Sequence, residues 1–197
     1  MRRALPCLLA LALLPGCGAD DERAAGSAQE AALAEALKRG GVALVMRHAI
    51  TESTTDREEK VGDCTTQRNL SDEGREQARR IGRAVEALGV PVDKVLASPF
   101  CRTTETAELA FGDARPSMAL LSAVEETTPE DDRRIRRLKE LATAPDGSAT
   151  VLVTHTANIG GAFDESVEEG DVVVVRDGEV LGVVGADDWT RLAEAAR

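Results

Sequence analysis

The sequence contains two histidines, His48 and His155. Each follows a short, mostly apolar run, Val42–Met46 and Ala149–Thr154, of the kind found in strands that are buried on both faces. Open α/β sheets bind ligands beyond the carboxyl ends of their strands, so we expect both imidazoles at that edge. A lone histidine is more often structural than catalytic, but two histidines at equivalent positions favour a functional pair.

Two arginines accompany these histidines. Arg47 immediately precedes His48, and Arg102 follows a second predicted strand, Lys94–Ala97, at the start of a predicted helix. Helix N-termini and planar guanidinium groups both favour phosphate oxygens. Taken alone, Arg102 could equally form a surface ion pair with Glu105. Together with the two histidines, however, the arginines predict a compact pocket for a tetrahedral oxyanion.

Alternating strands and helices must position these side chains. The sequence predicts helices over 28–39, 103–110 and 129–141, and one more that Ser71 caps and Gly89 ends. It predicts strands over 42–46, 94–97 and 149–154. Residues 172–175 and 180–184 are predicted to form a hairpin. Residues 49–69 and 112–128 are predicted to be irregular. This order predicts a single α/β domain with a mostly parallel sheet, helices on both faces and a C-terminal β-hairpin.

The charge balance restricts the possible partners. The 197 residues include 24 Lys and Arg against 35 Asp and Glu, a formal net charge of −11, and aromatic residues make up only 2%. Binding to nucleic acid needs a basic face or aromatic stacking surfaces, so we expect no nucleic-acid partner. Valine-rich runs such as 172–175 need a buried core, which excludes disorder throughout the chain. Any anionic ligand must therefore be held by a local cluster of cations.

Residues 1–16 are predicted to be an export signal. Arg2 and Arg3 precede an apolar run that ends at Leu14, and this run is shorter than the about 20 residues that a transmembrane helix needs. The segment Leu14–Cys17 resembles the bacterial lipobox, which implies cleavage before Cys17 and lipidation of that cysteine. The alternative is an ordinary secretory signal with a chance cysteine.

Processing at this point would give an exported lipoprotein that a lipid anchors to the membrane. Residues 17–28 would then form a short tether, and residues 29–197 would form the folded domain. Gly18 stands where an aspartate is associated with inner-membrane retention, so a Gram-negative host would place the protein at its outer membrane.

The motifs in this chain resemble those of the histidine phosphatase superfamily, the phosphoglycerate-mutase-like group. The family has Arg-His-Gly after a strand, a Leu-(Ser/Thr)-x-x-Gly-x-x-Gln-Ala helix start, a Ser-Pro-x-x-Arg-(Thr/Ala)-x-x-Thr-Ala segment and a second histidine after a strand. The matching segments occur here in the same order, as Leu44–Ala49, Leu70–Ala78, Ser98–Ala107 and Val151–His155. Ala49 and Thr156 depart from the pattern, because glycine is usual or common at both positions. We expect an altered pocket shape with activity retained.

The resemblance implies a phosphomonoester hydrolase that forms a phosphohistidine on His48. Arg47, Arg102 and His155 would bind the oxygens of the transferring group, and Thr51 would contribute to substrate binding. Neither a metal nor a cofactor is required by this scheme.

The family usually supplies a carboxylic acid that protonates the leaving group. Glu125 is the first candidate and Glu126 the second, and the acid is dispensable if the natural leaving group is already good, as in the phosphohistidine phosphatases of this superfamily. A short segment from Gly112 to Ser148 predicts a small lid and an open site. Sugar phosphates, envelope-glycan phosphates and phosphoproteins all remain candidate substrates.

Other functions fit the sequence less well. The Ala49 substitution and the uncertain acid leave open a non-catalytic lipoprotein that binds an oxyanion or phosphate. A mutase is less favoured, because an exported protein would not meet glycolytic intermediates. A cysteine-dependent phosphatase needs Cys-x5-Arg, and neither Cys64 nor Cys101 has an arginine six positions on. The Gly-x-Ser-x-Gly motif of serine hydrolases is absent, and the two histidines have no metal-ligand spacing.

Export would leave Cys64 and Cys101 in an oxidising compartment, where a disulfide between them is one hypothesis and two buried thiols the other. A loop of this length would contribute roughly 4 kcal/mol through the entropy of the unfolded chain. We expect mass spectrometry of the native exported protein to find both thiols unreactive towards alkylation until a reductant is added. Two thiols that react without reductant would exclude the bridge.

Overall fold

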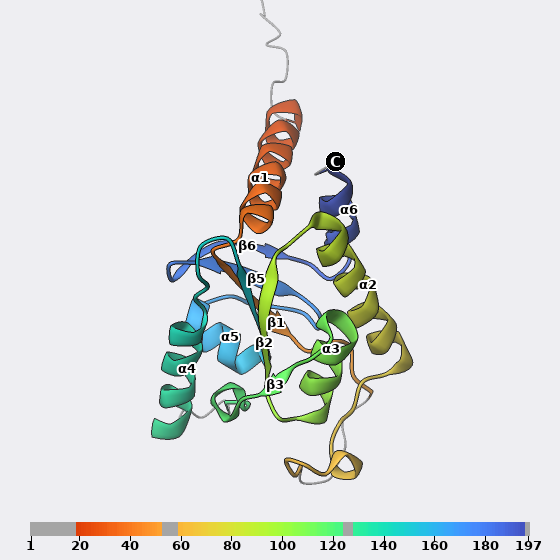
Figure 1. Ribbon diagram of the computed structural model, residues 1–197, viewed down its shortest axis with the longest axis vertical. Helices are drawn as coiled ribbons and strands as arrows, with labels where there is room; N and C mark the ends of the chain where they lie inside the picture. The colour runs from red at the N-terminus through yellow and green to blue at the C-terminus, as the bar shows by residue number, and fades with distance from the viewer. Residues whose placement is uncertain (1–18, 53–58, 124–127, 196–197) are drawn as a thin grey trace, which may run out of the picture.

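A six-stranded sheet forms the centre of the protein, whose computed structural model describes residues 19–52, 59–123 and 128–195 (Figure 1). Its strands are β1 (Val42–Arg47), β2 (Val92–Ala97), β3 (Arg115–Pro116), β4 (Ala149–Thr154), β5 (Val172–Arg176) and β6 (Glu179–Val184). They follow the order β3-β2-β4-β1-β5-β6, in which the first four are parallel and β5 and β6 form an antiparallel hairpin. The predicted fold class is confirmed.

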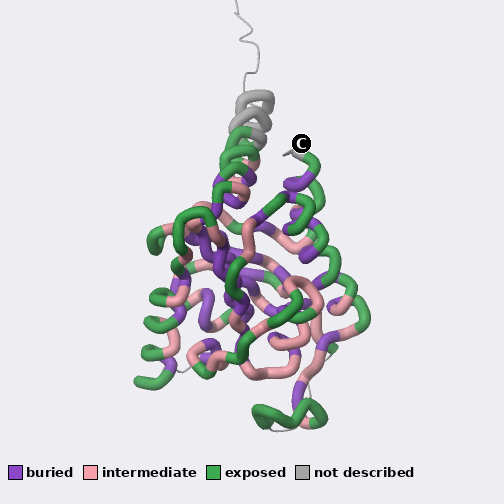
Figure 2. Tube along the Cα trace, in the orientation of Figure 1, coloured by how far each residue is buried: buried purple, intermediate pink, exposed green. Residues whose placement is uncertain are grey.

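Helices cover both faces of this sheet. They are α1 (Ala19–Arg39), α2 (Asp72–Leu88), α3 (Cys101–Phe111), α4 (Pro129–Leu141), α5 (Thr156–Phe163) and α6 (Asp188–Ala195), with short 3-10 turns η1 (Cys64–Thr66) and η2 (Met118–Leu120). Successive side chains of β1 point to opposite faces of the sheet and so belong to two separate halves of the core. Leu44 and Met46 pack with α1, α2 and α6, while Ala43 and Val45 pack with α4 and α5. Figure 2 shows the resulting buried centre between exposed outer helical surfaces.

The structure differs from the prediction at the N-terminal side and after β4. Helix α1 begins at Ala19, so most of the segment that we expected to be a short tether is helical, in keeping with its alanine-rich sequence. Helices α5 and α6 were not predicted. The Gly160-Gly161 pair weakens the local helix signal of α5, and burial of Ile159 and Ala162 outweighs it. Within the described ranges, no helix is long and apolar enough to cross a membrane.

Helix α2 positions α3, whose first turn follows β2. The Ser71 side chain caps α2 by accepting a hydrogen bond from the Gly74 N–H at 3.0 Å, and Gly89 ends it in the left-handed conformation. Midway along α2, the backbone of α3 passes so close that a Cβ on Gly82 would lie 2.1 Å from the Ala110 carbonyl oxygen. Glycine at this position allows the two helices to pack together.

We expect Gly82→Ala to destabilise the protein by about 2 kcal/mol or more, because two backbones must separate to admit the methyl group. Urea unfolding provides the measurement. Gly26→Ala is the matched control, since a Cβ on Gly26 of α1 would meet no atom within 4 Å. Equal stability of the two variants would contradict the close approach of α2 and α3.

Candidate active site

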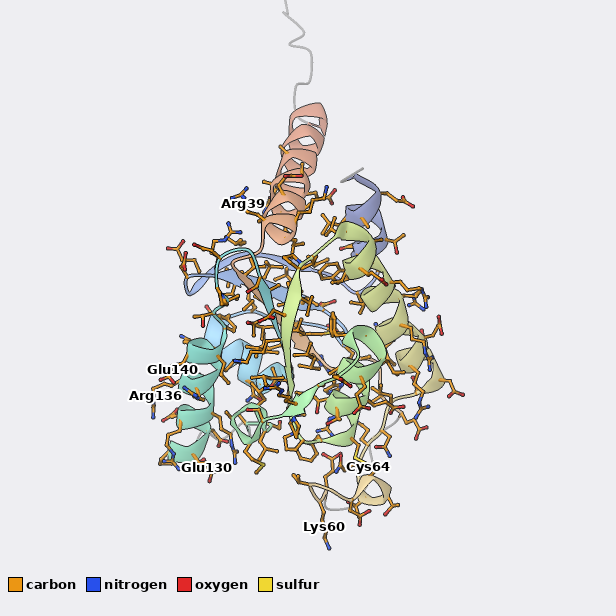
Figure 3. All side chains as sticks on the ribbon, viewed as in Figure 1. Arg39, Lys60, Cys64, Glu130, Arg136 and Glu140 are labelled. Carbon is orange, nitrogen blue, oxygen red and sulfur yellow. A yellow bond between two sulfur atoms is a disulfide. The ribbon has the colours of Figure 1, made fainter. Side chains whose placement is uncertain are left out.

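The carboxyl ends of β1, β4 and β2 bring both histidines and both predicted arginines together. His48 follows β1, His155 follows β4, and Arg102 lies in the first turn of α3 after β2. The two imidazole rings are 5.6 Å apart between centroids and pack edge to face. Cys64 of η1 marks this end of the molecule in Figure 3, and Arg39 of α1 lies at the opposite end.

The His48 ring is oriented by its own backbone. Its Nδ1 lies 2.9 Å from the carbonyl oxygen of Ala49, which can only accept a hydrogen bond, so Nδ1 carries the proton. Nε2 therefore keeps its lone pair. The pKa of His48 is lowered to about 3, first by burial and then by the positive charges of Arg102, Arg47 and Arg68. The hydrogen bond to the Ala49 carbonyl oxygen acts in the opposite direction and raises the pKa. His48 is thus a neutral imidazole at physiological pH.

The His155 ring is also fixed in place, by contacts with Ser98 and Phe100. Its Nε2 lies 2.9 Å from the Ser98 hydroxyl oxygen, and its ring packs edge to face against Phe100. His155 is only 4% exposed. Burial, followed by the charge of Arg102, lowers the pKa of His155 well below its ordinary value. Ser98 was quoted in a sequence motif, but its contact with His155 could not be derived from the sequence.

Arg102 points into the site and not along the surface of α3. Its guanidinium lies over the Phe100 ring, 4.5 Å from the ring centroid, and its Nη1 donates to Glu59 at 2.8 Å. Glu105, the surface partner considered above, instead accepts a hydrogen bond from Arg75 at 2.7 Å. Burial lowers the pKa of Arg102. The ion pair of Arg102 with Glu105 is therefore replaced by a contact within the site.

Two buried guanidinium donors have no partner among the described residues. They are the Nε atoms of Arg47 and Arg102. Arg47 donates from Nη1 to the Val167 carbonyl oxygen at 2.8 Å, which fixes its position beside His48. Buried N–H groups without acceptors destabilise a fold, so a pair of them beside two neutral histidines fits a site for an oxyanion.

Sequence reasoning missed a third arginine and two carboxylates. Arg68 belongs to the loop that was predicted only as irregular, and its charge acts on both histidines. Its Nη2 is 4.0 Å from Glu169, and its backbone N–H donates to Glu59 at 2.8 Å. The position of Arg68 two residues before the Leu70–Ala78 motif was the available signal.

A disulfide joins the two segments that carry Arg68 and Arg102. Cys64 of η1 is bonded to Cys101, the first residue of α3, with 5.7 Å between the two Cα atoms. Beside it, the Cys101 N–H donates to the Gln67 side-chain oxygen at 2.7 Å. The bridge thus fixes one side of the site covalently.

The Leu70–Ala78 motif supports the other side. Gln77 accepts a hydrogen bond from the Ile50 N–H at 3.0 Å and donates one to the Glu169 carbonyl oxygen at 2.9 Å. Gly170 has a φ of +92°, and a Cβ on it would lie 2.8 Å from the Gln77 side chain. Gln77 therefore connects the segment after His48 to the segment before β5, and glycine is needed at the junction.

The remaining predicted residues have different outcomes. The Thr51 hydroxyl donates to Glu169 at 2.7 Å. The Ala49 methyl group is fully buried and packs in a cluster with Leu70 and Ala78. Glu125, Glu126 and Cys17 lie outside the described residues. In the ranges that the structure describes, no three His, Cys, Asp or Glu side chains are grouped to hold a metal ion.

Comparison with known proteins supports this assignment of the motifs. Residues 43–128 match the histidine phosphatase superfamily, branch 1. This part of the chain is therefore similar to that superfamily. A structure of the protein histidine phosphatase SixA with tungstate has a TM-score of 0.55 and 16% identity, covering 75% of this chain and 98% of that chain. The structure of SixA from Agrobacterium tumefaciens has a TM-score of 0.52 and 17% identity, and the match covers 74% of this chain and 97% of that chain. At these identities the structural likeness shows the fold.

A shorter sequence match connects the chain to a curated phosphatase. The mitochondrial serine/threonine-protein phosphatase Pgam5 of Drosophila grimshawi is 40% identical over 53 residues. The match covers 27% of this chain and 18% of the length of Pgam5. It therefore concerns one segment of each protein.

Both buried histidines make the fold sensitive to acid. Between pH 6.5 and about 3 the unfolded chain protonates His48 while the native protein does not, so stability falls as the pH falls through this window. We expect His48→Asn to remove roughly 2 kcal/mol of the stability difference between pH 7 and pH 5. Urea unfolding at a series of pH values measures it, and parallel stability curves for both proteins would contradict a neutral buried His48.

Proposed function

We propose that the protein is a phosphomonoester hydrolase that acts through a phosphohistidine on His48. The observation that supports this proposal best is the neutral His48 ring, in which Nδ1 is protonated and the Nε2 lone pair is available. Three arginines, Arg47, Arg68 and Arg102, lie close enough for their charges to act on this ring. A site that is positive around a neutral nucleophile favours an anionic electrophile such as a phosphate ester.

In the proposed reaction, Nε2 of His48 attacks phosphorus and the bond from phosphorus to the ester oxygen breaks. The unpartnered N–H groups of Arg47 and Arg102 would bind oxygens of the transferring group, with Arg68 and His155 beside them. Water then hydrolyses the bond between nitrogen and phosphorus, which releases phosphate and restores the neutral ring. Besides the substrate and this water, the proposed steps use only side chains of the protein, and the scheme requires neither a metal nor a cofactor.

A proton for the leaving group is proposed to come from Glu125 or, second, from Glu126. A leaving group that needs no such acid is the alternative, and the naming of SixA as a protein histidine phosphatase supports it. Phosphoproteins therefore stand beside sugar phosphates and envelope-glycan phosphates as candidate substrates. Pgam5, a serine/threonine-protein phosphatase by name, also supports a phosphoprotein.

Export and anchoring through a lipid on Cys17 complete the proposal. The disulfide between Cys64 and Cys101 supports an oxidising compartment, because such bonds rarely persist where thiols are kept reduced. Helix α1 supports a spacing role, since its packed C-terminal end contains the buried Leu37 while the helix extends away from the sheet (Figure 1).

Hydrolysis of an aryl phosphate by the purified protein, with α1 included, tests the reaction. We expect His48→Ala to reduce kcat by about 1,000-fold or more, and Gly26→Ala, far from the site on α1, to leave it unchanged. Quenched wild-type protein should carry a phosphoryl group that is labile in acid and stable in base. Equal background hydrolysis by wild type and His48→Ala, with vanadate still bound, would contradict the enzyme and favour the phosphate-binding lipoprotein.

A further inference from the structure

Glu169 places a carboxylate beside the nucleophile. Its Oε1 lies 3.8 Å from Nδ1 of His48, 3.8 Å from Arg47 Nη2 and 4.0 Å from Arg68 Nη2. Thr51 holds the same oxygen through a 2.7 Å hydrogen bond from its hydroxyl. The side chain is 21% exposed, so it is partly shielded from water. A carboxylate at this position weakens anion binding unless it serves another purpose.

The backbone around Glu169 is fixed to the nucleophile segment. The Gly170 N–H donates to the His48 carbonyl oxygen, and the Arg47 N–H donates to the Asp171 carbonyl oxygen, both at 3.0 Å. Gln77 holds the Glu169 carbonyl oxygen from a third side. These bonds place the Glu169 backbone by contacts with His48 itself, so the carboxylate is not a surface group that happens to lie nearby.

The proposed reaction creates a charge that the rest of the site opposes. When Nε2 forms its bond to phosphorus, the His48 ring still carries the Nδ1 proton and becomes an imidazolium. Burial and the charges of Arg102, Arg47 and Arg68 all disfavour a positive ring, as the pKa of about 3 records. The Ala49 carbonyl oxygen accepts a hydrogen bond from the Nδ1–H group, but this oxygen carries no full negative charge that would balance the imidazolium.

We propose that Glu169 is the counter-ion of His48 and stabilises the imidazolium that forms when the ring takes up the phosphoryl group. This inference rests on the proposed function. In the step, the Nε2 lone pair forms the bond to phosphorus, the ester oxygen leaves with its electron pair, and the Nδ1 proton stays on the ring. In this role Glu169 acts on the reaction through its contact with His48, so it is a positioning residue.

A split between chemistry and binding distinguishes this role from a structural one. Glu169→Gln keeps the shape of the side chain and removes its charge. We expect the rate constant of phosphoenzyme formation in single turnovers to fall roughly 10- to 100-fold. We also expect vanadate to bind at least as tightly as in wild type, because a negative charge leaves the arginine cluster. Glu169→Asp, which retains the charge, should recover part of the rate.

Glu168→Gln is the matched control, because it removes the same charge from the exposed neighbouring residue. Equal rate constants of phosphoenzyme formation in Glu169→Gln and Glu168→Gln would overturn the proposal. A parallel loss of rate and of vanadate affinity in Glu169→Gln would also overturn it and indicate a structural role. If wild type itself forms no phosphoenzyme, the proposed function fails first, so the two failures are distinguishable.

Discussion

The parallel pairing of β1 with β4 is the constraint on which the site depends. Arg47 pairs with Thr154, so the histidine that follows each strand emerges at the same height, and the His48 N–H donates to the Thr154 carbonyl oxygen at 3.1 Å. A shift of one residue in either strand would turn one imidazole to the opposite face of the sheet. Both strands of this pair are buried on both faces, and this burial fixes the register.

Electrostatic balance within the site follows from this arrangement. Burial, together with the charges of three nearby arginines, keeps both histidines neutral. Two carboxylates, Glu59 and Glu169, offset part of the arginine charge. The chain carries a net charge of −11, so this cluster of arginines lies in a protein that is acidic as a whole. Its acidic surroundings should slow the approach of highly charged substrates in a salt-dependent way.

The sequence predicted those features that local pattern determines. The buried runs that precede His48 and His155 predicted two central strands, and the order of the motifs predicted the similarity of residues 43–128 to the histidine phosphatase superfamily. The disulfide between Cys64 and Cys101 was one of two hypotheses, but the side-chain contacts that Arg68 and Glu169 make with distant residues could not be predicted. Arg68 and Glu169 reach the site because a disulfide and Gln77 hold their loops there, and neither connection leaves a periodic signal. Helix α5 was missed because tertiary burial outweighs the low helix propensity of Gly160 and Gly161.

The two sides of the site are held by different kinds of bond. The disulfide closes a covalent ring that encloses α2 and β2 and has both of its ends at the arginine side. Loop closure restricts the unfolded chain inside this ring, whereas the segment that carries Glu169 lies outside it and relies on hydrogen bonds. Partial unfolding from the C-terminal hairpin would therefore separate Glu169 from His48, while the segments that carry Arg68 and Arg102 stay joined by the disulfide. The arginine side of the pocket should thus persist after the contact between Glu169 and His48 is lost.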